Sequence, residues 1–152
     1  MPSSSLDRPS SLDRQVQRRL RERGVRYTTG RRALVAALTA VDGPRSAAEL
    51  HELLQPAMPL SSLYRSLSVL QDAGVVAPHH GAKGITRYEM AEWFAGHHHH
   101  LVCVECGSVD DVEIPTDLEA RLRVLIDQVA SAAAFEPLDH SLEISGRCER
   151  CS

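Results

Sequence analysis

The chain has 152 residues, of which 43% are hydrophobic and 4% aromatic, and its formal net charge is −3. This length suits one average domain or two small ones, and no stretch approaches the roughly 20 apolar residues that cross a bilayer. Because the N-terminus also lacks a charged-then-apolar signal pattern, we expect a soluble, cytoplasmic protein with no membrane partner.

The two halves of the chain carry opposite charge. Residues 1–80 hold 11 arginines and 7 acidic residues, a net of +4, whereas residues 81–152 hold 6 basic and 13 acidic residues, a net of −7. This asymmetry predicts an anionic partner for the first half and cations for the second.

The first half has the pattern of short helices followed by two strands. Residues 1–10 are rich in Ser and Pro, and we expect them to be disordered. Helix signals then recur four times: residues 12–23, a cap at Thr28 or Thr29, the capping box Ser46 to Glu49, and a cap at Ser61 or Ser62. Residues 75–90 predict two short strands around a glycine-rich turn.

Helices followed by a β-hairpin predict a winged helix, in which the third and fourth helices form a helix-turn-helix. The fourth helix would enter the DNA major groove, and its apolar stripe leaves Ser62, Tyr64 and Arg65 on the outside. A small helical domain without a ligand is the simpler alternative. The basic flank from Arg14 to Arg32 favours DNA, because neutralising phosphates dominates DNA affinity.

The second half begins near Trp93 and has a mixed pattern. Strands are predicted at Leu101–Val104, Val109–Ile114 and 138–145, with a helix at 117–133. The predicted fold class is therefore α/β (mixed): an N-terminal winged helix-turn-helix at 11–90, followed by a small α/β dimerisation domain at 91–152. Such a small unit cannot bury all its apolar surface, so we expect a homodimer.

The four cysteines form two pairs with the same spacing. Two Cys-x-x-Cys turns can place four thiolates around one Zn²⁺ in a tetrahedron. A redox Cys-x-x-Cys motif is the alternative, but it leaves the second pair unexplained. The predicted structural zinc ligands are Cys103, Cys106, Cys148 and Cys151.

Four consecutive histidines precede the first cysteine pair. In an extended segment, alternate side chains face opposite sides, so His97 and His99 point one way while His98 and His100 point the other. One run can therefore supply two separate metal sites. His140 lies on an apolar strand face, where a packed core histidine is the simpler interpretation, but His97 and His99 are available as partner ligands.

Five segments together resemble the ferric uptake regulator family of metal-responsive repressors: LSSLYRSLSVLQDAGVV, RYEM, HHHHLVCVECG, LDHSLEISGRC and CERC. The similarity covers roughly residues 12–151. It implies a winged helix, a C-terminal dimerisation domain, a structural four-cysteine zinc and a regulatory metal at the hinge between the two domains.

The resemblance also assigns residues to sites. It implies Glu89, His98 and His100 as hinge ligands. A second site would use His97, His99, Glu119 and His140. Tyr64 and Arg65 match a DNA-contacting pair in the recognition helix, and Arg31 matches a DNA-backbone contact.

Two departures from the family pattern leave the regulatory metal open. Pro44 stands where iron- and peroxide-sensing members usually carry a His, and the chain has no fifth Cys of the kind zinc sensors often use. His79 or His80 from the wing is the candidate for the missing ligand. Such a mixed set suits Fe²⁺ or Zn²⁺, with Mn²⁺ also acceptable. Asp110 and Asp111 could also reach a metal, but solvated strand residues are the simpler interpretation.

The predicted function is a metal-dependent, DNA-binding transcriptional repressor that controls metal homeostasis and has no enzymatic activity. Its partners would be double-stranded operator DNA, a second copy of the chain and metal ions. A peroxide-sensing repressor of the same family is one alternative. A zinc-dependent hydrolytic enzyme is another, but no HExxH motif is present.

Overall fold

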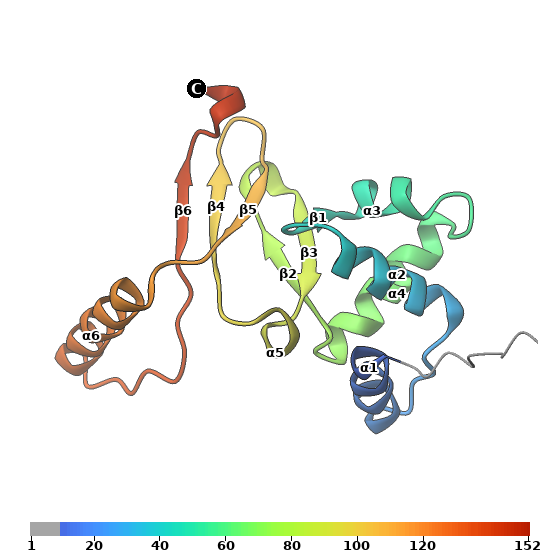
Figure 1. Cartoon of the computed structure of the whole chain (residues 1–152), viewed down its shortest axis with the longest axis horizontal. Helices are drawn as coiled ribbons and strands as arrows, with labels where there is room; N and C mark the ends of the chain where they lie inside the picture. Colours follow the sequence, from blue (N-terminus) through green and yellow to red (C-terminus); the bar gives the residue numbers. More distant parts are fainter. Residues whose placement is uncertain (1–9) are drawn as a thin grey trace, which may run out of the picture.

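The computed structural model describes residues 10–152 and contains two small sheets (Figure 1). The predicted disordered segment, 1–10, lies outside the described residues except for Ser10. The elements of the first half are α1 (Ser11–Glu22), α2 (Thr29–Ala40), β1 (Arg45–Ser46), α3 (Ala47–Leu54), α4 (Leu60–Asp72), β2 (Val76–His80), η1 (Ala82–Gly84) and β3 (Thr86–Met90). Within 10–152, no helix combines the length and apolar character that a membrane span needs.

Side-chain caps set the starts of the first three helices. The Ser10 hydroxyl accepts a hydrogen bond from the Asp13 amide, and Thr28 caps α2 in the same way. Ser46 and Glu49 form the predicted capping box of α3. These contacts satisfy amides that have no partner within the helix.

The predicted cap of the fourth helix is wrong. Helix α4 begins at Leu60 with Pro59 in the cap position, so Ser61 and Ser62 lie inside the first turn. Pro59 has the extended conformation of a cap residue, with φ −62° and ψ 148°, and makes no side-chain cap hydrogen bond.

The core of the winged helix comes from the inner faces of α2, α3 and α4. Leu34, Leu50, Leu63 and Leu70 are fully buried there, together with Val75 before β2. Each fully buried leucine contributes about 1.5–3 kcal/mol to folding. The wing sheet has the order β1-β3-β2, with both pairings antiparallel, and it places Glu89 opposite Ala77. This core fixes the wing relative to α4.

The second half contains a sheet of order β5-β4-β6. Its elements are α5 (Glu92–Ala95), β4 (His99–Cys103), β5 (Val109–Val112), α6 (Thr116–Ala132), β6 (Glu143–Gly146) and η2 (Glu149–Cys151). Strand β5 is antiparallel to β4, and β6 is parallel to it. The predicted mixed α/β fold, a winged helix-turn-helix followed by a small α/β unit, is confirmed.

The last predicted strand is shorter than expected. The register between β6 and β4 begins at Glu143, opposite His100, and the first hydrogen bond reaches the Leu142 carbonyl, so residues 138–141 lie outside the strand pairing. The apolar alternation in 138–145 therefore forms no buried face, and Leu138 is 93% exposed.

Helix α6 stands away from the winged helix, at the left of Figure 1. Its apolar residues Leu125 and Val129, with Phe135 just beyond it, are more than half exposed. By contrast, the wing lies beside β5, and the turn at Gly43 approaches the Val109 carbonyl so closely that a Cβ there would lie 3.1 Å from it. The two sheets therefore meet along the wing, and α6 does not take part in this contact.

Candidate metal centres

Within residues 10–152, four groups of side chains bring potential metal-ligand atoms within 4.8 Å of one another. We name three of them: the hinge cluster (Glu89, His98, His100, Asp111), the inner cluster (His97, His99, Glu119, His140) and the knuckle cluster (Cys103, Cys106, Cys148, Cys151). The fourth group, formed by Glu92, His97 and Asp139, is exposed and shares His97 with the inner cluster.

The hinge cluster joins the two sheets. Glu89 extends from β3 of the wing, whereas His100 lies on β4 directly opposite Asp111 of β5. The Nε2 atoms of His98 and His100 each lie 3.1 Å from a Glu89 carboxylate oxygen. His98 and Glu89 are about nine-tenths buried. A cation bound at this point would therefore take ligands from both sheets.

The orientation of His98 suits metal binding. Its Nδ1–H donates to the Gly96 carbonyl at 2.9 Å, which leaves the lone pair of Nε2 facing the Glu89 carboxylate. Two acceptors this close require a proton or a cation between them. Metal-ligating histidines are typically oriented by just such a hydrogen bond from their other ring nitrogen.

The charge state of Glu89 also fits a cation site. Burial alone would raise the pKa of this carboxyl, but hydrogen bonds from His100 and His79 outweigh burial and hold the pKa far below its ordinary value. Burial disfavours protonation of His98, yet the Gly96 carbonyl and the Glu89 charge raise its pKa overall. The cluster thus attracts positive charge, which a divalent cation would supply in place of protons.

The two wing histidines occupy different places. His79 contacts the Glu89 carboxylate through its Nε2, and its ring centroid lies 4.0 Å from that of His100. His80 is exposed and contacts the Thr86 hydroxyl, at 3.3 Å. Of the two candidates, the structure brings only His79 to the hinge cluster.

Asp111, for which a solvated strand position was the simpler expectation, lies beside the two hinge histidines. One of its carboxylate oxygens lies 3.5 Å from His100 Nε2 and 3.7 Å from His98 Nε2. Burial, and then the nearby Glu89 charge, raise its pKa. Alternation along β5 separates Asp111 from Asp110, but the sequence alone does not give the register that places Asp111 opposite His100.

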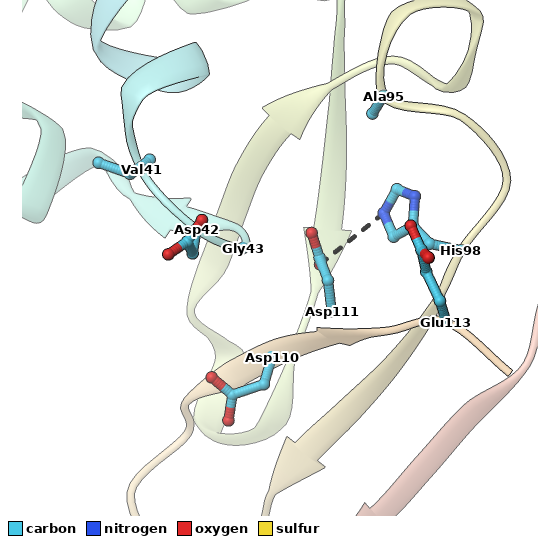
Figure 2. Close-up of a pocket in the computed structure, with 8 residues that line it drawn as sticks. All are labelled: Val41, Asp42, Gly43, Ala95, His98, Asp110, Asp111 and Glu113. Atoms are coloured by element: carbon cyan, nitrogen blue, oxygen red, sulfur yellow. Dashed lines mark ion pairs between the residues drawn. The ribbon is translucent and has the colours of Figure 1, made fainter.

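An open, acidic cavity of about 460 Å³ adjoins the hinge cluster. Figure 2 shows Asp111 pointing toward the His98 ring, while Asp110 points away from it. The lining residues are Val41, Asp42, Gly43, Ala95, His98, Asp110, Asp111 and Glu113. Its carboxylates favour cations over anions near the hinge cluster.

The inner cluster lies on the other side of the histidine run. Glu119 of α6 is its centre: one carboxylate oxygen lies 2.9 Å from His99 Nε2 and the other 2.9 Å from His140 Nε2. The second pair is buried but does not have hydrogen-bond geometry. His97 Nε2 is 3.3 Å from the same oxygen. Closely spaced, unpaired ligand atoms of this kind fit a shared cation.

The knuckle cluster closes the end of the second sheet. Cys103 ends β4, and the Cys148 amide donates to its sulfur at 3.4 Å. The sulfurs of Cys106 and Cys148 are 3.8 Å apart, and none of the four cysteines forms a disulfide. Thiolates about 2.3 Å from a tetrahedral zinc lie about 3.8 Å from one another, so the spacing fits zinc.

The thiols of the knuckle cluster cannot all ionise without a cation. Hydrogen bonding with Ser108 lowers the pKa of Cys106 to about 6. Hydrogen bonding to Cys148 raises the pKa of Cys151 to about 12. Zn²⁺ binds thiolates, so it would supply the charge that stabilises the fourth one.

The predicted DNA-contacting residues lie on two helices. Ser62, Tyr64 and Arg65 are exposed on α4, and Tyr64 is 53% exposed. Arg31 lies in the first turn of α2, with Nη1 donating to the Arg26 carbonyl. Its buried Nε has no hydrogen-bond partner among the described residues. A winged helix joined to three metal-ligand clusters indicates a metal-responsive DNA-binding protein.

Comparisons with known proteins identify the family. The ferric uptake regulator family profile matches residues 22–145. The ferric uptake regulation protein of Bacillus subtilis is 33% identical over 146 residues, covering 93% of this chain and 94% of that protein. The peroxide-responsive repressor PerR of Staphylococcus aureus is 28% identical over 138 residues, covering 87% and 86%. The Vibrio cholerae ferric uptake regulator structure aligns with a TM-score of 0.69 at 29% identity, covering 87% and 98%.

The chain belongs to the ferric uptake regulator family, and the predicted resemblance is confirmed. Members of this family are metal-responsive transcriptional regulators, so the chain is a regulator and not an enzyme. The alternative of a zinc-dependent hydrolytic enzyme is set aside.

Proposed function

We propose that the chain is a dimeric, metal-activated repressor that controls metal homeostasis through a regulatory divalent metal in the hinge cluster. One observation carries the proposal: Glu89 of the wing, His100 of β4 and His98 just before β4 converge on one point. Ligands drawn from both sheets make metal occupancy and the relative position of the sheets interdependent.

The ligands of the hinge cluster fix the sheets relative to one another. Glu89 holds the wing, and the two histidines hold β4, so losing either contact would free the hinge. Going from about 1% to about 99% of the DNA-binding arrangement requires about 5.5 kcal/mol of preferential metal affinity. Three or four ligands can provide this, and losing one can remove it.

The donor set narrows the choice of metal without naming one. Imidazole and carboxylate ligands suit Fe²⁺, Zn²⁺ and Mn²⁺, whereas thiolates select zinc. We therefore assign iron or zinc to the hinge cluster, with manganese acceptable, and structural zinc to the knuckle cluster. Asp111 completes the hinge set, and His79 supports it through its contact with the Glu89 carboxylate. The inner cluster, from His97, His99, Glu119 and His140, would hold a further ion within the second unit.

We also propose the boundary between the two units. The winged helix, 11–90, would bind operator DNA, and residues 91–152 would bind metal and dimerise. Arg65 and Tyr64 project from α4, the second helix of the helix-turn-helix, which supports major-groove contact. The exposed apolar groove of about 420 Å³ along α6 supports a second copy of the chain as the partner.

A DNA-binding titration tests the proposal. Metal-depleted protein with its knuckle zinc retained is titrated with Fe(II), Zn(II), Mn(II) and Ni(II) in turn, and binding to its own promoter fragment is measured. Arg65→Ala is the control, because it keeps every candidate ligand and removes one base-contacting side chain. We expect the metal to bind both proteins but only wild type to bind DNA tightly. Binding that ignores every metal contradicts the proposal.

A peroxide-sensing repressor is the second candidate, favoured by the nitrogen and oxygen ligands of the hinge cluster, which suit Fe(II). Hydrogen peroxide applied to Fe(II)-loaded protein would then abolish operator binding and add oxygen to His98 or His100. Peptide mass spectrometry detects this change. Mn(II)-loaded protein is the control and should remain unmodified.

A further inference from the structure

Arg87 is a buried arginine at the centre of the wing sheet. It lies on β3, opposite Ser46 of β1 on one side and His79 of β2 on the other. Its side chain is only 10% exposed. A guanidinium stays charged in a protein, so its burial requires well-placed acceptors.

Two acceptors from distant parts of the chain meet this requirement. The Arg87 Nε–H donates to the Gly107 carbonyl at 2.9 Å, and Nη1 donates to a Glu49 carboxylate oxygen at 2.7 Å. The same Glu49 oxygen accepts the Ser46 amide at 2.7 Å. The guanidinium therefore connects the capping box of α3 to the turn of the knuckle cluster.

The knuckle turn determines where the Gly107 carbonyl lies. Gly107 follows Cys106 directly, has a φ of +73° and donates its amide to the Cys103 carbonyl at 2.9 Å. A Cβ at Gly107 would lie 3.6 Å from the Ala82 carbonyl of the wing. Any rearrangement of the Cys103–Cys106 turn would therefore move the acceptor away from Arg87.

We propose that Arg87 is a positioning residue that couples the knuckle cluster to the helix-turn-helix and acts across the same interface as the hinge cluster. The inference rests on the proposed function, because it assigns the coupling to a metal-activated repressor. The hinge ligands and Arg87 both join the wing to the second sheet. Each therefore favours the closed arrangement, and each strengthens the other.

The geometry explains why an arginine is required. A planar guanidinium reaches two acceptors in different directions with fixed donors, whereas a lysine ammonium is a compact point charge. Arg147 provides a matched comparison beside the same knuckle. Its contact is an exposed ion pair with Glu105, at 3.4 Å, within the second half of the chain. This pair does not connect the two sheets.

The reactivity of the cysteines measures the coupling directly. All four cysteines belong to the knuckle cluster, so dithiodipyridine reports only on this site. The whole chain, with zinc in the knuckle cluster, is mixed with the reagent, with and without Mn(II), which prefers carboxylate oxygens to thiolate. Electron paramagnetic resonance gives the Mn(II) occupancy. The variants are Arg87→Met, Arg87→Lys and Arg147→Met.

We expect Mn(II) to slow the thiol reaction of wild type and Arg147→Met by about tenfold, which corresponds to about 1.4 kcal/mol. In Arg87→Met this protection should disappear, and in Arg87→Lys it should be partly retained. If Arg87→Met does not fold, the thiol protection measured in Arg87→Lys tests the proposal in its place. Full protection in a folded Arg87→Lys, or none in wild type, overturns the proposal. Operator binding by wild type tests the repressor function separately, because that assay does not depend on thiol protection.

Discussion

The hinge cluster and the inner cluster use alternate histidines of one run, yet they connect different parts of the molecule. The hinge cluster joins Glu89 of the wing to His98 and His100. The inner cluster joins His97 and His99 to Glu119 of α6, so all of its ligands lie after the wing. Strand alternation turns His99 and His100 of β4 to opposite sides, and His97 and His98 just before β4 follow the same alternation.

Because the two clusters connect different elements, a bound ion would have a different structural effect in each, although the ligand types are the same. An ion in the hinge cluster would change the position of the wing relative to the second sheet, and therefore the position of α4. An ion in the inner cluster would stabilise α6 against β4 and leave the wing unaffected. If the proposed function holds, regulation would depend on which elements supply the ligands, since both clusters combine imidazole with carboxylate.

The largest effect is expected from a substitution that destabilises β4, the strand that supports both the hinge cluster and the inner cluster. Strand β4 carries His99 and His100 and ends at Cys103, so Cys148→Ser should lose the knuckle zinc and disorder the strand. Structural zinc sites contribute apparent binding energies of about 10–16 kcal/mol, which are folding energy. We expect the variant to lose about one zinc per chain and to lose its dimer, measured by elemental mass spectrometry and sedimentation.

Ser152→Ala is the control for this variant, because it removes the hydrogen bond from Ser152 to the Cys148 carbonyl and keeps every sulfur. It should retain zinc and dimerise normally. A Cys148→Ser protein that keeps its zinc and its dimer would exclude the four-cysteine assignment.

The next prediction compares substitutions at two adjacent histidines, one from the hinge cluster and one from the inner cluster. His98→Ala should lower metal affinity at the hinge by more than about 100-fold, beyond the 10–100-fold typical of outer-shell partners. It should therefore abolish metal-dependent operator binding. His97→Ala should keep that response while lowering the metal content or the dimer stability. Operator affinity is measured against free metal for both variants, and equal losses would mean that the histidine run serves one site.

The sequence predicts those features whose interacting residues lie close together along the chain, and it predicts the others less well. Caps and apolar periodicity predicted α1, α2 and α3 because those signals are local. The strand at 138–145 was predicted too long because its extent is set by its partner β4, not by its own alternation. For the same reason, the sequence favoured a solvated position for Asp111 over a place among the metal ligands. Its role depends on pairing with His100 and on the approach of Glu89 from a separate sheet.

A smaller effect separates the two wing histidines. His79→Ala should lower hinge-metal affinity about tenfold, because His79 contacts the central Glu89 carboxylate. His80→Ala should stay within about twofold of wild type, as surface substitutions usually do. Isothermal titration with Mn(II) measures both. A larger loss for His80→Ala would require a different wing position in the metal-bound protein.

The smallest expected effect concerns the hinge ligand supplied by β5. Asp111 is partly exposed and lies farther from the two histidines than Glu89 does, so it should contribute less. A partly exposed charge pair is typically worth about 0.2–1 kcal/mol, which predicts about a 1.4-fold to fivefold loss of metal affinity in Asp111→Asn. Asp110→Asn is the matched control, because it removes the same charge from the neighbouring position, which points away from His98 (Figure 2).

Equal effects in both variants would show that the acidic cavity attracts cations only through its total charge. A loss confined to Asp111→Asn would place the carboxylate in the ligand set. The hinge cluster would then take ligands from β3, β4 and β5 and fix the edge of the second sheet that faces the wing. The inner cluster, by contrast, would fix only α6.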